Sequence, residues 1–340
     1  MIPIKNVYYM LCYAFKVLHE QGYKKLATES FENAADMCAA ILMKGISNQL
    51  KCGLGREYIP ETDVVSTIRG KIEISESIKT QSMIRNQLVC TFDAFSVDSY
   101  MNRIIKATAM LLLKADIAKA RKKELRKLMV FFGEVSDIDV RLINWSFRYN
   151  RNNQTYRMLI SVCYLVIKGL LQSKSDGSVK LMDFFDEQRM CRLYEKFILE
   201  YFKKHYGLLN PASSQIKWAV DDGFDFMLPT MQSDIMLTYK GTTLIIDAKY
   251  YSNTTQIQYD TRTLHSNNLY QIFTYVKNKS VESGPVSGML LYAMTDEAIV
   301  PDSEYQMSGN IISVRTLNLN CDFSQIAEQL NSIAKRYFDT

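Results

Sequence analysis

The chain has 340 residues, of which 47% are hydrophobic and 23% are charged, with a net charge of +5. These proportions are ordinary for a soluble globular protein, and the length allows two domains. No apolar run approaches the roughly 20 residues that span a bilayer. The first residues lead directly into an amphipathic pattern without a signal-peptide layout. We therefore expect a cytoplasmic protein with no membrane partner.

The seven cysteines and three histidines narrow the kinds of metal site that are plausible. The cysteines are scattered and never form a C-x-x-C pair, so we expect them to be reduced and expect no structural zinc. Three histidines are too few for a histidine-rich site. A catalytic metal would therefore be held by carboxylates, which favours magnesium or manganese.

The first half of the chain has mainly helical periodicity. Apolar residues at helical spacing predict helices over 6–20, 30–49, 97–128 and 155–171. Between residues 57 and 74, β-branched and aromatic residues on both sides of Gly70 predict strands or an extended β-hairpin. The polar, glycine-containing stretch 174–178 is the best linker candidate. We therefore expect an N-terminal domain over 1–175 and a second domain over 176–340.

The second half of the chain alternates helices and strands. We expect helices over 186–205, 266–277 and 323–337, and strands near 215–219, 233–239, 242–249, 288–293 and 311–316. This order is typical of an α/β unit. The expected fold class is therefore α+β: a mainly helical N-terminal domain with an extended β-hairpin, followed by an α/β domain.

The segment 233–249 carries the clearest chemical signal. A two-residue turn at 240–241 would set the register of a hairpin in which Asp234 lies opposite Asp247. Their Cβ atoms should then be about 4.5–5.5 Å apart on one face of the sheet. Lys249, two residues beyond Asp247, shares that face.

Two opposed carboxylates repel each other, so the pair makes physical sense with a divalent cation between them. A metal there would polarise a phosphate and lower the pKa of a bound water. Lys249 would orient that water or offset charge on the phosphate. The alternative is an ordinary surface hairpin, because a bare D-x-K occurs in many proteins.

The predicted helix after this hairpin carries a polar stripe. His265, Asn268, Gln271 and Tyr275 are spaced three and four residues apart, which places them on one side of a helix. Such a stripe facing two carboxylates would orient DNA and metal-bound water. A stripe that simply faces solvent is the alternative.

A basic run extends from residue 103 to residue 127. It contains nine lysines and arginines, among them Lys122, Lys123 and Arg126, against two acidic residues. The run could follow a phosphate backbone, or it could be a solvated helix face. The chain has no G-x-x-x-x-G-K-[ST] motif, so we expect it to hydrolyse no nucleotide itself.

Several segments resemble the McrC family within the PD-(D/E)xK nuclease superfamily. McrC-like proteins are the nuclease subunits of McrBC modification-dependent restriction systems. The resemblance covers nearly the full length. It rests on IPIKNVYYMLCYA (2–14), IRGKI (68–72), NRIIK (102–106), LYEKF (193–197), Asp234, DAKYY (247–251) and HSNNLYQ (265–271).

The resemblance implies roles for several residues that spacing alone does not give. Asp234 and Asp247 would be the metal ligands, and Lys249 the catalytic lysine. Glu195, which the sequence alone indicates as a solvated helix residue, would be the acidic residue of the superfamily's first helix. Ser233 stands where proline is typical of the superfamily, at a position that is not a ligand.

Gln271 and Tyr275 resemble the superfamily's Q-x-x-x-Y element, and the C-terminal domain would have a restriction-endonuclease-like fold. The resemblance thus implies a magnesium-dependent endonuclease that cuts double-stranded DNA with modified cytosine. Two other functions stay open: a stand-alone repair or recombination nuclease, and a catalytically silent adaptor of an AAA+ ring.

The resemblance also implies a partner. McrC-like proteins act with McrB-like AAA+ GTPase rings, and their N-terminal half docks into the ring and stimulates GTP hydrolysis. We expect the segment 57–74 to contact the ring, with Arg69 and Lys71 forming the basic tip of a hairpin. An ordinary β-hairpin packed on helices is the alternative.

Overall fold

A computed structural model describes residues 2–15, 26, 29, 31, 33–150, 153, 155–172, 187–251, 255–258, 261–282, 284–294 and 300–338. The chain forms two compact units. The sheet unit joins Met1–Phe31 to Phe185–Thr340, and the arm unit comprises Glu32–Phe184. The linker expected at 174–178 lies outside the described residues.

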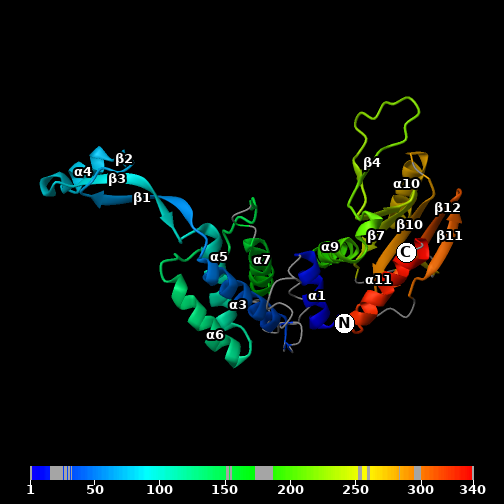
Figure 1. The fold of residues 1–340 in the computed structure, drawn as a ribbon, viewed down its shortest axis with the longest axis horizontal. Helices are drawn as coiled ribbons and strands as arrows, with labels where there is room; N and C mark the ends of the chain where they lie inside the picture. Colours follow the sequence, from blue (N-terminus) through cyan, green and yellow to red (C-terminus); the bar gives the residue numbers. More distant parts are fainter. Residues whose placement is uncertain are drawn as a thin grey trace. The chain divides into compact units, whose positions relative to one another are not determined.

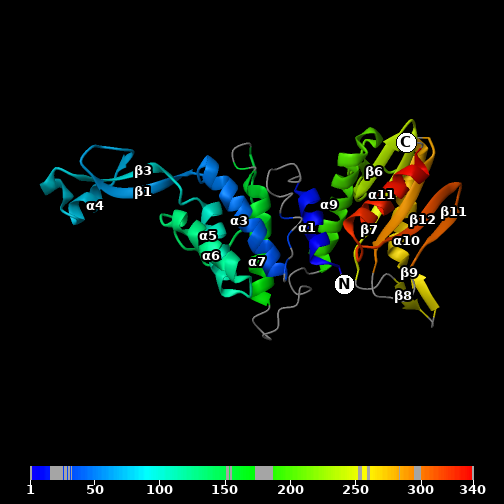
Figure 2. The same cartoon turned by 60° about the horizontal axis from the view of Figure 1, so that its bottom comes forward.

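The N-terminal helix α1 (Ile4–Ala14) corrects the expected division of the chain. We predicted a domain over 1–175, yet α1 belongs to the sheet unit and lies along helix α9 (Glu187–His205) (Figures 1 and 2). Tyr13 packs edge-on against Phe197 and hydrogen-bonds His205 at 2.9 Å. Burial of the Tyr13 and Phe197 rings ties the first helix to a partner that is distant in the sequence.

The arm unit has a helical base that agrees with the helices predicted over 30–49 and 155–171, whereas the single helix predicted over 97–128 divides into two. Asn33 and Ser99 cap two of these helices by accepting the N–H groups of Asp36 and Asn102. Asp36 is buried and pairs with Arg121 at 2.9 Å. The helices are α3 (Ala34–Cys52), α5 (Tyr100–Lys114), α6 (Lys119–Met129) and α7 (Tyr156–Gln172).

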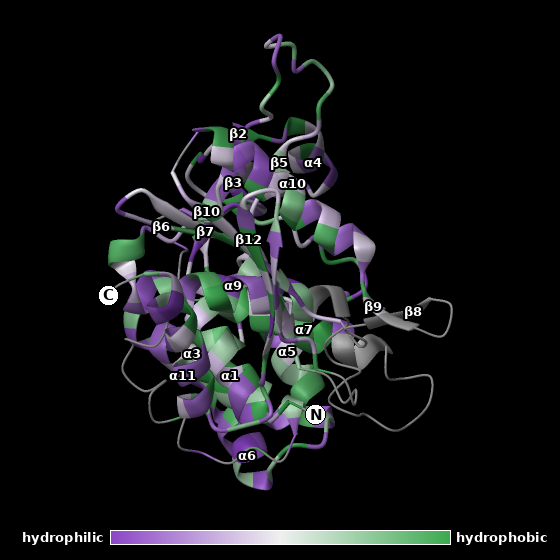
Figure 3. Ribbon diagram, turned by 90° about the vertical axis from the view of Figure 1, so that its right-hand side faces the viewer, coloured by the Kyte–Doolittle hydropathy of each residue, from purple (hydrophilic) through white to green (hydrophobic). Residues whose placement is uncertain are grey.

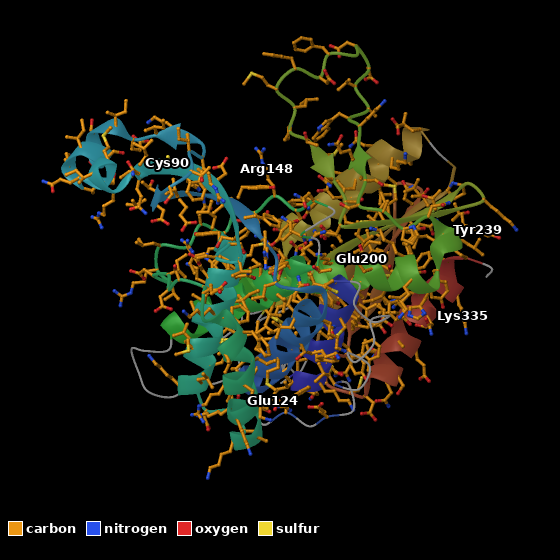
Figure 4. The ribbon with its side chains drawn as sticks, turned by 60° about the vertical axis from the view of Figure 1, so that its left-hand side comes forward. Cys90, Glu124, Arg148, Glu200, Tyr239 and Lys335 are labelled. Carbon is orange, nitrogen blue, oxygen red and sulfur yellow. The ribbon has the colours of Figure 1, made fainter. Side chains whose placement is uncertain are left out.

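A β-ribbon, the arm, extends from this helical base (Figure 1). Its long strands β1 (Glu57–Val65) and β3 (Leu88–Ser96) pair antiparallel over their whole lengths, while the short strand β2 (Lys71–Ile72) lies on the other side of β3. Helix α4 (Ile74–Lys79) and the 3₁₀ turn η2 (Ser82–Arg85) complete the far end. Cys90, labelled in Figure 4, is fully buried there.

The prediction of a hairpin over 57–74 is therefore wrong in its pairing. The two runs on either side of Gly70 lie on opposite sides of β3 and do not pair with each other. Gly70 has φ +61°, and a Cβ there would lie 2.3 Å from the carbonyl oxygen of Thr91. The chain thus folds back against the middle of β3, which only glycine allows.

The sheet unit is built on a five-stranded mixed sheet in the order β11-β12-β10-β7-β6. Strand β10 runs parallel to both of its neighbours, and the two edge strands are antiparallel to theirs. The strands are β6 (Ile235–Tyr239), β7 (Thr242–Lys249), β10 (Val286–Ala293), β11 (Ser303–Met307) and β12 (Asn310–Leu317). Two short pairs flank the sheet: β4 (Gln215–Ile216) with β5 (Met231–Gln232), and β8 (Thr255–Gln258) with β9 (Thr261–Leu264).

Helices cover both faces of this sheet. Helix α10 (Ser266–Glu282) packs its Ile272 and Val276 against Gly288, where a Cβ would lie within 3 Å of both side chains. On the other face, Tyr337 of α11 (Phe323–Tyr337) bonds Ser313 at 2.8 Å. Helix α9 adjoins α11 and the strands β6 and β7. The fold class is α+β, as predicted.

None of the helices in the described part of the chain is long and apolar enough to cross a membrane.

Candidate active site

The β6–β7 hairpin has the register that the sequence predicts. Lys240 and Gly241 have φ values of 45° and 83°, the left-handed conformations of a tight two-residue hairpin turn. Pairing runs from Tyr239 with Thr242 to Ile235 with Ile246. Asp234 directly precedes the first paired residue of β6, and Asp247 directly follows the β7 partner of that residue.

Asp234 is held at the entry to β6 by the backbone of the neighbouring strand. Its Oδ2 accepts the N–H of Ala248 at 2.9 Å. This bond holds the Asp234 carboxylate at the end of β7, beside Asp247 and Lys249, which flank Ala248 in the sequence. The hairpin thus brings one carboxylate and the D-x-K residues of the next strand together.

Asp247 is a buried carboxylate, with 1% of its surface exposed. Burial raises its pKa to about 7; Lys249 opposes this rise, and the neighbouring Asp234 adds to it. The Lys249 amine lies 3.0 Å from Oδ1 and 2.9 Å from Oδ2, so that it pairs with both carboxylate oxygens. The single lysine therefore does not fully offset the burial of Asp247 and its closeness to Asp234.

Lys249 is held in its charged form by these carboxylates. Burial lowers the pKa of a lysine, but Asp247 and then Asp234 more than offset this effect, so that the pKa of Lys249 lies above its usual value. The side chain is 13% exposed. Lys249 is thus a fixed ammonium group at the edge of the site.

Glu195 comes to the same place from helix α9. Burial raises its pKa, and the nearby Asp234 charge raises it further, while Lys249 acts in the opposite direction. Cys191, one turn earlier, donates its S–H to Oε1 of Glu195 at 3.3 Å. Glu195 is therefore half-buried and near enough to Asp234 to be influenced by its charge, and the sequence indication of a solvated residue is wrong.

The polar stripe of α10 lies only partly in solvent. Asn268 is 5% exposed, and its amide bridges two tyrosines: Nδ2 donates to Tyr292 at 3.0 Å, and Oδ1 accepts from Tyr251 at 3.3 Å. A direct DNA contact by Asn268, as the sequence suggested, conflicts with this burial. His265 packs its ring near that of Tyr251, at 5.3 Å.

Gln271 and Tyr275 lie further along the same helix. Gln271 donates its side-chain N–H to the Tyr275 hydroxyl at 2.9 Å. Tyr275 is buried in the core between α10 and the sheet. The structure therefore pairs these two residues with each other, and among the described contacts neither bonds a site carboxylate.

The candidate DNA-binding residues of the basic run lie in the arm unit. Lys123 and Arg126 are exposed on α6, and Lys122 is partly exposed. The helix is mostly hydrophilic (Figure 3). Arg121 on the same helix instead points inward to Asp36, so the run serves both as a solvated face and as an anchor for the fold.

Arg69 and Lys71 also lie in the arm unit, but the predicted basic tip is wrong. Lys71 pairs with Thr91 in the middle of β3 and bonds Glu73 at 2.9 Å. The Arg69 guanidinium lies 5.9 Å from the centre of the Phe92 ring. Both residues therefore line the side of the arm, and α4 and η2 form its end.

Two tyrosines near the site escaped the sequence analysis. Tyr292 is fully buried on β10 and pairs in register with Lys249. Tyr251 follows two residues after that lysine. The DAKYY run and the predicted strand 288–293 contain both residues, but only parallel pairing of β7 with β10 brings them together.

The donor set fits a divalent cation. Asp234 and Asp247 are hard oxygen ligands, and the closeness of these two carboxyl groups, which helps to raise the pKa of Asp247, is a repulsion that a cation between them would relieve. Within the described ranges, no three acidic, histidine or cysteine side chains converge into a preformed cluster. A cation at this pair would therefore keep water among its ligands, as magnesium usually does.

Comparisons with known proteins identify the family to which the chain belongs. The chain is 30% identical over 343 residues to the type IV methyl-directed restriction enzyme EcoKMcrBC of Escherichia coli K12, covering 99% of this chain and 98% of that protein. Its fold matches McrC bound to McrB AAA+ hexamers from Thermococcus gammatolerans with a TM-score of 0.54 at 17% identity, covering 97% of this chain and 76% of that one. The profile of the family described as "McrBC 5-methylcytosine restriction system component" matches residues 4–293. The chain therefore belongs to the family of McrBC 5-methylcytosine restriction system components.

Proposed function

We propose that this chain is the endonuclease subunit of a McrBC-type restriction complex. It would hydrolyse phosphodiester bonds of double-stranded DNA that carries modified cytosine. The observation that carries the proposal is the buried Asp247 carboxylate at the end of one hairpin, with Asp234 and Lys249 beside it and Glu195 of α9 near Asp234. Such a group is costly to a fold that does not use it.

Each side chain of the group has a distinct task in this proposal. Asp234 and Asp247 would hold magnesium or manganese, with Glu195 close by. A bound cation supplies Lewis-acid polarisation of a phosphate and a water of lowered pKa. Lys249, which keeps its proton, places a positive charge where negative charge develops on the phosphate.

The partner would be an AAA+ GTPase ring. The solved structure that this fold resembles is described as McrC bound to McrB AAA+ hexamers. We propose that the arm contacts such a ring, because its far end exposes five large apolar residues: Ile68 (62%), Ile74 (64%), Ile78 (63%), Met83 (54%) and Ile84 (79%). We call these residues the distal patch. Arg69 and Lys71, on the side of the arm, stay proposed contacts.

The two other functions are less well supported. A silent adaptor has no need to bury Asp247 beside Asp234 and Lys249. A stand-alone nuclease does not account for family membership over nearly the whole chain.

Asp247→Asn tests the nuclease assignment, because it keeps the shape of the side chain and removes its charge. We expect magnesium-dependent cleavage of modified DNA, with the partner ring and GTP present, to fall more than about 100-fold, the upper end of what loss of an outer-shell metal partner costs. Asp302→Asn is the control, because this carboxylate lies in the same unit and its side chain is 66% exposed.

The assignment fails if the folded Asp247→Asn protein cleaves at a rate near that of the wild type. Cleavage of modified DNA by the wild-type chain without a ring or GTP would instead support the stand-alone nuclease.

A further inference from the structure

Lys249 stands at the last paired position of β7, where the backbone alone restrains it weakly. Pairing of β7 with β10 ends at Lys249 and Tyr292. Beyond that point the strand hydrogen bonds stop, and chain ends of this kind fray. A lysine that must point at one atom needs a further restraint.

The side chains around Lys249 provide such a restraint from both directions. Tyr292 lies beside it on β10 and is fully buried. Tyr251 lies two residues after it, and its hydroxyl donates to Asn268 at 3.3 Å. The Asn268 amide in turn donates to Tyr292 at 3.0 Å, and the two tyrosine rings lie 6.3 Å apart.

Asn268 is the centre of this arrangement. It comes from the first turn of α10, is 5% exposed, and uses both ends of its amide in the two tyrosine bonds. A buried amide gains little net stability over an apolar residue of the same shape, so its presence indicates a requirement for geometry. The amide fixes the distance between the neighbouring strand and the segment that leaves β7.

We infer that Tyr251, Asn268 and Tyr292 form a clamp that holds the end of β7, and that Asn268 and Tyr292 are positioning residues for Lys249. Asn268 therefore acts through Lys249 and not through a contact with DNA. The catalytic consequence rests on the proposed nuclease function, whereas the restraint on Lys249 does not.

The test measures the accessibility of Lys249 in the folded full-length chain. In the wild type, a 13%-exposed, ion-paired amine should react slowly with an acylating reagent, which peptide mass spectrometry detects. With Asn268→Leu, which removes both bonds of the clamp, we expect acylation of Lys249 to rise roughly 25-fold, a factor of about five for each hydrogen bond of typical net strength. Tyr251→Phe, which removes one bond of the clamp, should give a smaller rise.

The chain offers a matched control in the same unit. Tyr201 of α9 donates to Oδ1 of Asn331 at 2.8 Å, the same kind of bond between a tyrosine and an asparagine, formed between α9 and α11. Asn331→Leu and Tyr201→Phe should leave acylation of Lys249 unchanged. An equal rise in the control variants, or no rise in the clamp variants, overturns the inference.

Cleavage assays separate this inference from the proposed function. With the partner ring and GTP, the clamp variants should lower the single-turnover rate of cleavage. The DNA concentration that gives half of the maximal rate should stay unchanged. If Asn268 instead contacted DNA, its loss would raise that concentration. If the wild type does not cleave while Lys249 acylation still rises in Asn268→Leu, the clamp stands and the nuclease proposal fails. Should Asn268→Leu not fold, Tyr251→Phe with its Tyr201→Phe control carries the comparison.

Discussion

Asp247 links the charge of the site to the stability of the fold. The pKa of its carboxyl group rises from 3.8 to about 7 because the group is buried and because Asp234 is close, although Lys249 opposes the rise. Between these two values the folded chain holds a proton that the unfolded chain releases. Raising the pH through this interval therefore removes stability from the metal-free protein.

Asp247→Asn should abolish this pH dependence. We expect the free energy of unfolding of the wild type, measured by denaturant with a chelator present, to fall relative to that of the variant between pH 5 and pH 7. The slope would be at most about 1.4 kcal/mol per pH unit, the value for one proton. Parallel stability curves for the two proteins would show that burial of Asp247 does not shift its pKa.

At the level of single residues, the sequence predicts the part of the site that lies on the β6–β7 hairpin, but not the part that the helices supply. The turn at Lys240 and Gly241 fixes the register by local geometry, so the approach of Asp234 to the D-x-K residues of β7 could be predicted from the sequence. The hydrogen bonds of Asn268 and the burial of Glu195 could not be predicted from the sequence, because they depend on how α10 and α9 pack on the sheet.

The arm shows where pattern reading fails for a whole element. Strand β1 was expected from its β-branched and aromatic residues, but its partner β3 begins 23 residues after β1 ends. The sequence places a nearer β-like run between them, and local patterns favour the nearer partner. The close approach of Gly70 to β3 is what distinguishes the observed strand pairing, and the hydrophobic periodicity of the sequence gives no sign of it.

Gly70→Ala should therefore disrupt the arm. A methyl group there meets a backbone oxygen at 2.3 Å and also imposes the strain of a positive φ on alanine. Gly53→Ala is the matched control, since φ there is also positive, at 85°, with no atom within 4 Å. We expect amide hydrogen exchange in β2 and β3 to accelerate in Gly70→Ala only. Equal protection of those strands in both variants would show that the close approach of Gly70 to β3 is not what orders the arm.

At the scale of the whole molecule, the order of the sequence and the division into units differ. The arm unit is inserted between α1 and the rest of the sheet unit. Composition and linker signals predict two domains but cannot predict this arrangement, because it depends on the aromatic contacts of Tyr13 with α9. An inserted unit with its own exposed patch suits a division of labour, with the site on one unit and the proposed ring contact on the other.

This division predicts variants with opposite defects. Ile84→Asp places a charge in the distal patch and should reduce GTP hydrolysis by the partner ring to the rate of the ring alone, because desolvating a charge opposes docking of an apolar surface. Asp247→Asn should keep full stimulation of GTP hydrolysis while losing cleavage. Leu142→Asp is the control for the first variant, since Leu142 and Ile84 are both 79% exposed in the arm unit.

Complex formation, GTP hydrolysis and DNA cleavage should be measured on the same preparations. Substitution at such exposed positions usually changes stability by at most about 0.5 kcal/mol, so a defect would reflect contact and not unfolding. If Ile84→Asp stimulates the ring as well as Leu142→Asp does, the distal patch is not the contact. The combined substitution Arg69→Ala with Lys71→Ala then tests the side of the arm. If Asp247→Asn loses stimulation together with cleavage while staying folded, the two activities are not divided between the units, and the site itself takes part in controlling the ring.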